Sequence, residues 1–464
     1  MLSTFLTASG QHVGRAPLLN LDFEETRLAT ANSKVPMDLY YANLADILEL
    51  ILLESDERFD ELEDNESIRL KTIKNLDKPS PWSAFVQAEI KLQWAFVKFK
   101  YGKEWDAFWS LRSAYRLAKS NAKDYPGFEP NQRTLGVLNI IFGNVPSKNQ
   151  WLMNLFGLRG DVLTGLNQLS TIGADYPELA IESKLILGMT NAYLLEDFRK
   201  AADFIDQSKA GDEPLFRYVK SLVYSKAHKA IVSRELLSNS DKHFPIHDYL
   251  IAETYFQAGD YQTAINHYEK FLNSFTGKSY IKDTYLKLSI SYGLIGQIET
   301  YERYLDKSRN EGDDYSEVDK NAAKIAKTLD TQNPTALRIR FAIDGGFYQK
   351  ADSLITLLGK KKDLSEYERL ELTYRKARLN HLQGNTQEAK AFYQQVIGSA
   401  ALISETYYAP NSFLQLGYLM KDSGDIASAK MYFHEVLSFR KHPYKSSLDS
   451  KAKIALKQIT PKGD

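Results

Sequence analysis

The chain of 464 residues contains no cysteine. Disulfides, thiolate metal ligands and cysteine nucleophiles are therefore excluded, and the redox compartment is left open. The chain also lacks an apolar run of the roughly 18 to 20 residues that a membrane-spanning helix needs. Its best stretch, residues 45–53, is interrupted by Asp46 and Glu49, so we expect no spanning segment.

An excess of charge of either sign is missing too, because 59 Lys and Arg residues balance 59 Asp and Glu residues. A broad basic excess is typical of nucleic-acid binders and of proteins held to anionic membranes. We therefore expect no nucleic-acid partner. Runs that alternate apolar and polar residues, as β-strands do, are also absent. Apolar residues instead recur at helical spacing, as in residues 40–53, which predicts an all-α protein.

A fixed order of small and large residues recurs in the C-terminal half. In the clearest copy, Gly417 and Ala429 are small where two helices must approach closely, and Gly424 stands where the first helix must end. The frame of this copy is Phe413, Leu416, Gly417, Met420, Gly424, Ile426, Ala429, Phe433 and Val436. A second copy has Ile251, Ala252, Tyr255, Gly259, Tyr261, Ala264, Tyr268 and Phe271. With weaker copies, the expected turn glycines are Gly259, Gly296, Gly346, Gly384 and Gly424.

This frame resembles that of the tetratricopeptide-repeat family. The resemblance implies an all-α, right-handed α-solenoid of irregular helix pairs, in which each repeat buries its apolar face against its neighbours. The gap from Gly296 to Gly346 is longer than the repeat unit of roughly 34 residues. We therefore expect an extra helix over residues 318–329, with interruptions of the stack near residues 310–315 and at Asn333-Pro334.

The N-terminal half shows a degenerate version of the same frame. Residues 95–114 carry it beside Trp94, and residues 185–204 form a further helix pair. The predicted divisions are an extended tail or signal remnant over residues 1–36, degenerate helical repeats over 37–245, tetratricopeptide-like repeats over 246–310, and further such repeats over 311–464 that continue the same array.

The central segment carries a second pattern. It consists of Leu135-Gly136-Val137-Leu138-Asn139, Val145-Pro146, Phe156-Gly157-Leu158-Arg159-Gly160-Asp161 and Gly165-Leu166-Asn167-Gln168-Leu169. This segment resembles the signature of the inclusion-body-clearance family of tetratricopeptide proteins. Val145, Leu158 and Val162 replace that family's leucine, phenylalanine and arginine. The resemblance implies one all-helical unit.

No catalytic constellation accompanies these repeats. Among eight histidines, only His243 and His247 have metal-ligand spacing, but Pro245 lies between them and no glutamate follows the first. We interpret this segment as an exposed loop without a metal. Phosphate-binding glycine loops and Gly-x-Ser-x-Gly elbows are absent. The sequence therefore predicts neither an enzyme nor a cofactor site.

A partner-binding groove is the function that the repeats favour. In tetratricopeptide arrays the first helices line a concave face that suits an extended peptide or a partner helix. The expected inward positions are Tyr249, Glu253, Phe256, Tyr374, Arg378, Leu414 and Tyr418. The alternative is that these residues pack against an inserted helix or a neighbouring repeat. We predict a noncatalytic scaffold that binds a protein segment, with its oligomeric state open.

Tryptophan suggests an alternative function. All five tryptophans lie in the N-terminal third: Trp82, Trp94, Trp105, Trp109 and Trp151. Aromatic clusters can stack on sugars or small molecules, which would make this third a glycan- or small-molecule-binding region. At helical spacing, however, such residues are more often packed between helices, and we expect that here.

The N-terminus leaves the cellular setting open. Residues 2–7, Leu-Ser-Thr-Phe-Leu-Thr, look like the end of a secretory signal, and Ala8 and Gly10 suit a cleavage site, but a basic start and a full apolar stretch are missing. Residues 2–10 are interpreted either as a truncated secretory signal or as a short tail. The first alternative predicts a periplasmic or cell-envelope protein in bacteria, and the second a cytoplasmic one.

Overall fold

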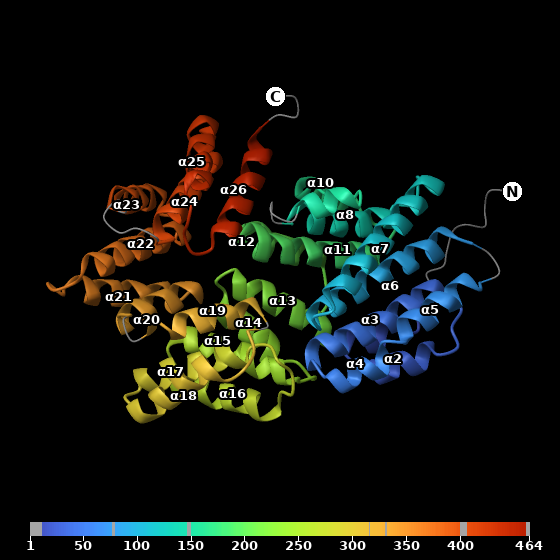
Figure 1. Ribbon diagram of the computed structural model, residues 1–464, viewed down its shortest axis with the longest axis horizontal. Helices are drawn as coiled ribbons and strands as arrows, with labels where there is room; N and C mark the ends of the chain where they lie inside the picture. The colour runs from blue at the N-terminus through green and yellow to red at the C-terminus, as the bar shows by residue number, and fades with distance from the viewer. Residues whose placement is uncertain are drawn as a thin grey trace.

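The computed structural model describes residues 12–76, 79–145, 150–314, 316–329, 332–399 and 406–460. These ranges fold into an all-α solenoid, as predicted, and contain no strand (Figure 1). None of the helices in this part of the chain is long and apolar enough to cross a membrane. The possible signal remnant at residues 2–10 lies outside the described residues, as do Pro146 and Tyr315.

The N-terminal helices begin the array. Their bounds are α1 (Arg15–Leu19), α2 (Phe23–Thr30), α3 (Pro36–Leu53), α4 (Asp56–Leu62), α5 (Asn65–Lys74), α6 (Pro81–Lys100), α7 (Glu104–Asp124), α8 (Pro130–Gly143) and α9 (Gln150–Leu155). The middle helices are α10 (Val162–Ser170), α11 (Pro177–Thr190), the π-helix η2 (Asn191–Leu195), α12 (Phe198–Ser208), α13 (Pro214–Lys226), α14 (Ala230–Ser238), α15 (Pro245–Ala258) and α16 (Tyr261–Ser274).

The remaining helices complete it. They are α17 (Ile281–Leu294), α18 (Ile298–Asn310), α19 (Glu317–Ala326), α20 (Pro334–Asp344), α21 (Tyr348–Gly359), α22 (Glu366–Leu382), α23 (Thr386–Ser399), α24 (Tyr408–Asp422), α25 (Ile426–Ser438) and α26 (Lys445–Ile459). The helix pairs are α6–α7, α8–α10, α11–α12, α13–α14, α15–α16, α17–α18, α20–α21, α22–α23 and α24–α25. The extra helix expected over residues 318–329 is confirmed as α19, which packs on α17, after which α20 packs on α15.

The two helices of a pair begin with different signals. Proline stands in the first turn of α6, α8, α11, α13, α15 and α20, where its missing N–H costs no hydrogen bond. Second helices often begin with a capping aspartate, whose carboxylate accepts a backbone N–H: Asp161, Asp197, Asp260 and Asp425. The predicted turn glycines are confirmed, since all five have a φ between 74° and 84°.

Glycine also permits the closest helix crossings. A Cβ at Gly417 would overlap the ring of Phe433, which confirms the predicted contact point. In the central segment, a Cβ on Gly165 would lie 2.5 Å from the carbonyl oxygen of Gly136. The glycines of that segment therefore let α8 and α10 pack with their backbones nearly in contact.

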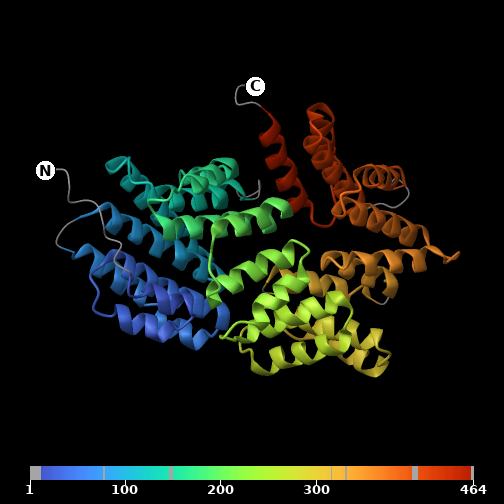
Figure 2. The same cartoon turned by 180° about the vertical axis from the view of Figure 1, so that it is seen from behind.

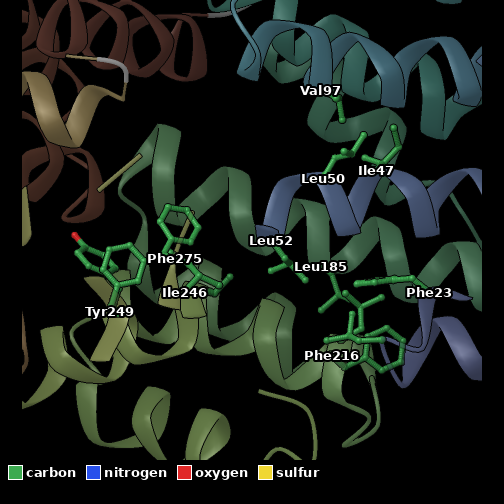
Figure 3. Packing of buried hydrophobic residues seen from close by; sticks show 14 of the residues in the cluster. Phe23, Ile47, Leu50, Leu52, Val97, Leu185, Phe216, Ile246, Tyr249 and Phe275 are labelled. Carbon is green, nitrogen blue, oxygen red and sulfur yellow. The ribbon is translucent and has the colours of Figure 1, made fainter. Parts of the chain in front are cut away.

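One hydrophobic cluster joins the N-terminal helices to the middle of the array, extending from Leu18 to Leu337. Figure 3 shows Leu52 of α3 between Ile246 of α15 and the side chains of Leu185 and Phe216. This cluster crosses the boundaries predicted at residues 245/246 and 310/311. The four-part division of the chain stays a prediction.

The tryptophans are divided between core and surface. Trp94 is fully buried, and Trp82 packs against Phe85 with ring centroids 5.8 Å apart. Trp105 and Trp109, by contrast, are 64% and 46% exposed. The predicted core position is correct for Trp94 and wrong for these two, whose rings contact Phe108 and, for Trp109, Phe156 at the surface. The side chain of Trp151 lies outside the description.

Candidate functional site

A cleft of about 1030 Å³ lies where the C-terminal helices return to the middle of the chain. One wall consists mainly of residues of α10, η2 and α12, and the other mainly of residues of α22, α24 and α26. Residues 227–229, which follow α13, and Tyr348 of α21 complete the lining. Figures 1 and 2 show α26 standing between α24–α25 and the helices α10 and α12. We call this hollow the central cleft.

Polar contacts join the two walls at α26. They are the ion pairs Lys451 Nζ–Glu196 Oε1 at 2.6 Å and Lys457 Nζ–Asp161 Oδ2 at 3.0 Å, and a hydrogen bond from Ser450 Oγ to Asn144 Oδ1 at 2.8 Å. Lys457 is 60% exposed, so solvent screens its ion pair, whereas Lys451 is only 8% exposed. The Lys451–Glu196 pair is therefore the main polar link between the walls.

The local backbone places Glu196 at this link. α11 continues into the π-helix η2, and Glu196 then adopts a left-handed conformation with φ 54°. Asp197 follows as the cap of α12, where its carboxylate accepts from the Lys200 N–H at 3.2 Å. Burial acts to raise the pKa of the Glu196 carboxyl, but the Lys451 ammonium outweighs it and holds the pKa below its usual value. Glu196 is therefore ionised at neutral pH.

Two histidines, His228 and His381, and one arginine, Arg378, also line the cleft. Burial, followed by the charge of Arg378, lowers the pKa of His381 to about 3 and also lowers the pKa of His228. Both imidazoles are therefore neutral at neutral pH. Nδ1 of His228 donates to the carbonyl oxygen of Asp344 at 3.0 Å, which leaves Nε2 as a buried acceptor without a partner. Nδ1 of His381 lies 3.2 Å from the hydroxyl of Tyr393.

This lining suits recognition by polar and aromatic contacts. Arg378 offers hydrogen-bond donors, Glu196 and His228 offer acceptors, and Tyr348 and Tyr418 offer rings. Such a mixture matches the backbone and side chains of a protein segment. Among the residues that the structure describes, no group of three His, Asp or Glu side chains could hold a metal ion.

The residues predicted to line a groove lie in different environments. Arg378 and Tyr418 line the central cleft together. Tyr249, Phe256, Tyr374 and Leu414 are buried, with exposed fractions of 0 to 4%. A partner could not touch these four side chains without repacking, because they fill the space between helices of neighbouring repeats. Their position is the one given by the alternative in which these residues pack against a neighbouring repeat.

Glu253 belongs to an internal network of α15, α16 and α17. Lys287 Nζ lies 2.8 Å from both of its carboxylate oxygens, and the hydroxyl of Tyr268 donates to it. In the same network, Tyr249 donates to Asp283 at 2.8 Å. Burial, opposed by Lys287, raises the pKa of Asp283 to about 6. These polar groups satisfy one another inside the array.

The interpretation of His243 and His247 as one exposed loop needs correction. His247 is completely buried in the first turn of α15, and burial lowers its pKa to about 4. His243 instead contacts Asp248, with Nε2 2.7 Å from Oδ2, and His267 lies 3.0 Å from the other oxygen of that carboxylate. Pro245 begins the helix here, which is why the loop ends earlier than expected.

Several lining residues escaped the sequence analysis. Glu196, His228 and Lys451 lie outside the repeat frames, and the contact between residues 196 and 451 depends on the return of α26. The only local signal was at position 197, where an aspartate before an apolar helical pattern indicates a helix start.

Comparison with known families and structures gives the following matches. A family model described as tetratricopeptide repeat matches residues 248–277 and 372–400. No curated protein sequence matches. The central segment's resemblance to the inclusion-body-clearance family is not among these findings and stays a prediction.

Solved structures of helical-repeat proteins are also similar. The Cut9 and Hcn1 hetero-tetramer of the APC/C matches with 14% identity and a TM-score of 0.25, covering 97% of this chain and 95% of that chain. Yeast Tom70 matches with 14% identity and a TM-score of 0.24, covering 97% and 88%. The TPR domain of P58(IPK) matches with 14% identity and a TM-score of 0.22, covering 80% and 98%. Scores this low carry no functional argument.

Proposed function

We propose that this tetratricopeptide-repeat protein is a noncatalytic scaffold that binds an extended protein segment in the central cleft. Tetratricopeptide repeats support a role in protein interaction. The observation that carries the proposal is the cleft itself, because α26 returns to α10 and leaves a hollow of about 1030 Å³ between the walls. That volume is at the upper end of ordinary ligand pockets, which run to about 1,000 Å³.

The polar groups of the cleft define what such a segment would offer. Arg378 would receive a carboxylate or a backbone carbonyl, and the unpartnered Nε2 of His228 would accept an N–H. Tyr418 would pack against an apolar or aromatic side chain. A short segment with an acidic residue and an aromatic residue fits these contacts.

Photo-crosslinking tests the proposal in living cells. A photoreactive phenylalanine analogue would replace Tyr418, and a control chain would carry it at Met431, which is 52% exposed on α25. We expect a protein cross-linked at 418 and identified by mass spectrometry, and its loss when Arg378→Ala is added. Absence of any cross-link at 418, or the same products at 431, would count against the cleft.

The tryptophan-rich third supports a second candidate function. Trp105 and Trp109 are exposed, and Arg112 lies 5.5 Å from the ring of Trp109, beside Phe156. This surface fits a glycan or small aromatic molecule. Quenching of tryptophan fluorescence by a glycan panel, abolished in Trp109→Ala, would favour it, and an unchanged spectrum would remove it.

The setting in a bacterial cell envelope is part of the proposal only through residues 2–10. The upstream genomic sequence tests it. An in-frame extension with a basic start and an apolar stretch before Met1 would support export. An in-frame stop codon there would contradict it.

A further inference from the structure

A second hollow lies inside the N-terminal half and is separate from the central cleft. Six helices form a closed ring around it: α1 packs on α3, α3 on α6, α6 on α8, α8 on α11, α11 on α13, and α13 on α1. The hollow has a volume of about 580 Å³. We call it the ring lumen.

Polar and apolar lining residues are separated along the lumen. On α3, Tyr40 and Tyr41 come first and the apolar Leu44, Leu48 and Ile51 follow. The N-terminal part of α11 lies beside the two tyrosines, because Tyr40 donates a hydrogen bond to Glu182 at 2.6 Å and Tyr41 donates one to Glu178.

The helices α8 and α11 repeat that order. On α8, Arg133 precedes Val137, Ile140 and Ile141, and on α11 the two glutamates precede Ile186 and Met189. The lumen therefore has one polar end and a long apolar body. An apolar surface of this kind, left uncovered inside a protein, is typical of a ligand site.

The volume of the lumen is that of a small-molecule site. Its 580 Å³ falls within the range of ordinary ligand pockets, roughly 300 to 1,000 Å³, and the six helices of the ring form its sides. A single flexible hydrocarbon chain fits such a pocket.

The polar end selects the head group. Its charged residues are three glutamates, Glu89, Glu178 and Glu182, and two arginines, Arg15 and Arg133. Arg133 contacts Glu89 at 2.5 Å and Glu182 at 2.6 Å, and Arg15 contacts Glu178 at 3.1 Å. Three carboxylates against two guanidinium groups leave one negative charge in excess, and this charge repels an anionic head group.

One donor at this end has no partner. Arg133 is 7% exposed, and its Nε–H makes no hydrogen bond although the rest of its guanidinium does. A buried N–H without an acceptor costs free energy, and a ligand oxygen would satisfy it. An ammonium head would repel Arg133 and could not accept this hydrogen bond.

We propose that the ring lumen binds a ligand made of one hydrocarbon chain and an uncharged, oxygen-bearing head, such as an alcohol or an ester. The chain lies along Leu44, Leu48 and Ile140, and a head oxygen accepts from Nε of Arg133. This site does not depend on the proposed function of the central cleft, and neither result decides the other.

Displacement of a neutral fluorescent probe tests the site on the whole chain. N-phenyl-1-naphthylamine should gain fluorescence with the protein, and monododecanoylglycerol should displace it. Dodecanoate and dodecylammonium should need roughly tenfold higher concentrations, because each places a like charge beside Glu182 or Arg133. Displacement by dodecanoate or dodecylammonium at the same concentration as the glyceride, or no displacement by the glyceride, would overturn the proposal.

A matched pair of variants locates the binding. Leu48→Trp fills the lumen and should weaken displacement by roughly tenfold or more. Leu28→Trp makes the same exchange at a side chain that is 70% exposed on α2, and should bind as the unaltered chain does. Unchanged binding by a folded Leu48→Trp chain, or equal loss in both, would refute the assignment.

A second test looks for a gain of binding and does not need a variant that fills the lumen. Glu182→Gln keeps the shape but removes the spare charge. Dodecanoate should then bind about as well as the glyceride. Native mass spectrometry should count one ligand on each chain, and persistent discrimination against dodecanoate in this variant would contradict the assigned role of the glutamates.

Discussion

The ring lumen and the central cleft are both built from packed helix pairs but differ in closure and chemistry. Packed helices close the ring, and its lumen is apolar apart from one buried polar end. The cleft is bridged at α26 by two ion pairs and one hydrogen bond, and its lining mixes charged, aromatic and aliphatic side chains. Closure by packing fixes the helices around the lumen, whereas closure by a few polar contacts leaves a wall that can separate from its neighbour.

The largest expected effect comes from breaking the buried charges of the ring. Arg133→Ala would leave Glu89 and Glu182 without their common partner, and we expect a loss of about 3–5 kcal/mol. All five tryptophans lie at or before residue 151, so tryptophan fluorescence in urea reports on this half. Arg15→Ala is the control, with an expected loss of about 1 kcal/mol or less at a partly exposed pair. Equal losses would contradict the difference in burial.

A second substitution addresses the close crossing of α8 and α10. Gly165→Ala places a Cβ 2.5 Å from the carbonyl oxygen of Gly136, so we expect a loss of about 1–3 kcal/mol in urea unfolding followed by circular dichroism, which reports on helices of the whole chain. Gly398→Ala is the matched control, because no atom lies within 4 Å of its added Cβ. In a helix this change should be neutral or stabilising by up to about 1 kcal/mol. A tolerated Gly165→Ala would show that the backbones can separate.

Acid should weaken the cleft side through its histidines, which the ring lumen lacks. The pKa of His381 is about 3 in the folded chain and about 6.5 when unfolded, so the unfolded chain binds more protons between these pH values. The contribution of the neutral, buried His381 to the free energy of unfolding is therefore retained above pH 6.5 and decreases as the pH falls below that value. We expect a loss of about 1–2 kcal/mol from pH 7 to pH 5, measured by urea unfolding with circular dichroism. His381→Gln should remove this part of the loss; an unchanged pH dependence would contradict it.

The smallest expected effect concerns the link at α26. Lys451→Ala removes the ion pair with Glu196, but the Glu196 side chain is 34% exposed and water can solvate its carboxylate, so global stability should fall by about 1 kcal/mol or less. Hydrogen exchange of the backbone amides of α26 should nevertheless accelerate, because the contact of Lys451 with Glu196 helps to hold this helix against the rest of the chain. Ser447→Ala, at an exposed position of the same helix, is the control, and equal acceleration in both variants would show that the link does not hold the wall.

Local features of the fold were predictable because they depend on short-range rules. The turn glycines from Gly259 to Gly424 and the contact of Gly417 with Phe433 follow from spacing within one repeat, and α19 follows from the long gap between two successive turn glycines. The central glycines had a visible pattern, but their role in the crossing of α8 and α10 required the structure.

The candidate site was far less predictable. Repeat spacing indicates that Tyr249 and Tyr374 point inward, but it does not say whether the next repeat will cover them, and here it does. The contact of Glu196 with Lys451 depends on the curvature accumulated over many helix pairs. The frame therefore identified Arg378 and Tyr418 among the lining residues, but not the wall that faces them.

The most direct test of the central claim is a reversible lock on the cleft. Ser450 donates to Asn144 at 2.8 Å, and the chain has no native cysteine, so Asn144→Cys with Ser450→Cys gives one engineered disulfide. The readout is the photo-crosslink at position 418 in the reduced and oxidised chains. Because α26 must move away from its neighbours for an extended segment to enter the cleft, we predict that a protein segment cross-links in the reduced chain and is excluded when the disulfide fixes α26 in place. Identical cross-linking in both states, or none in either, would contradict binding in the central cleft.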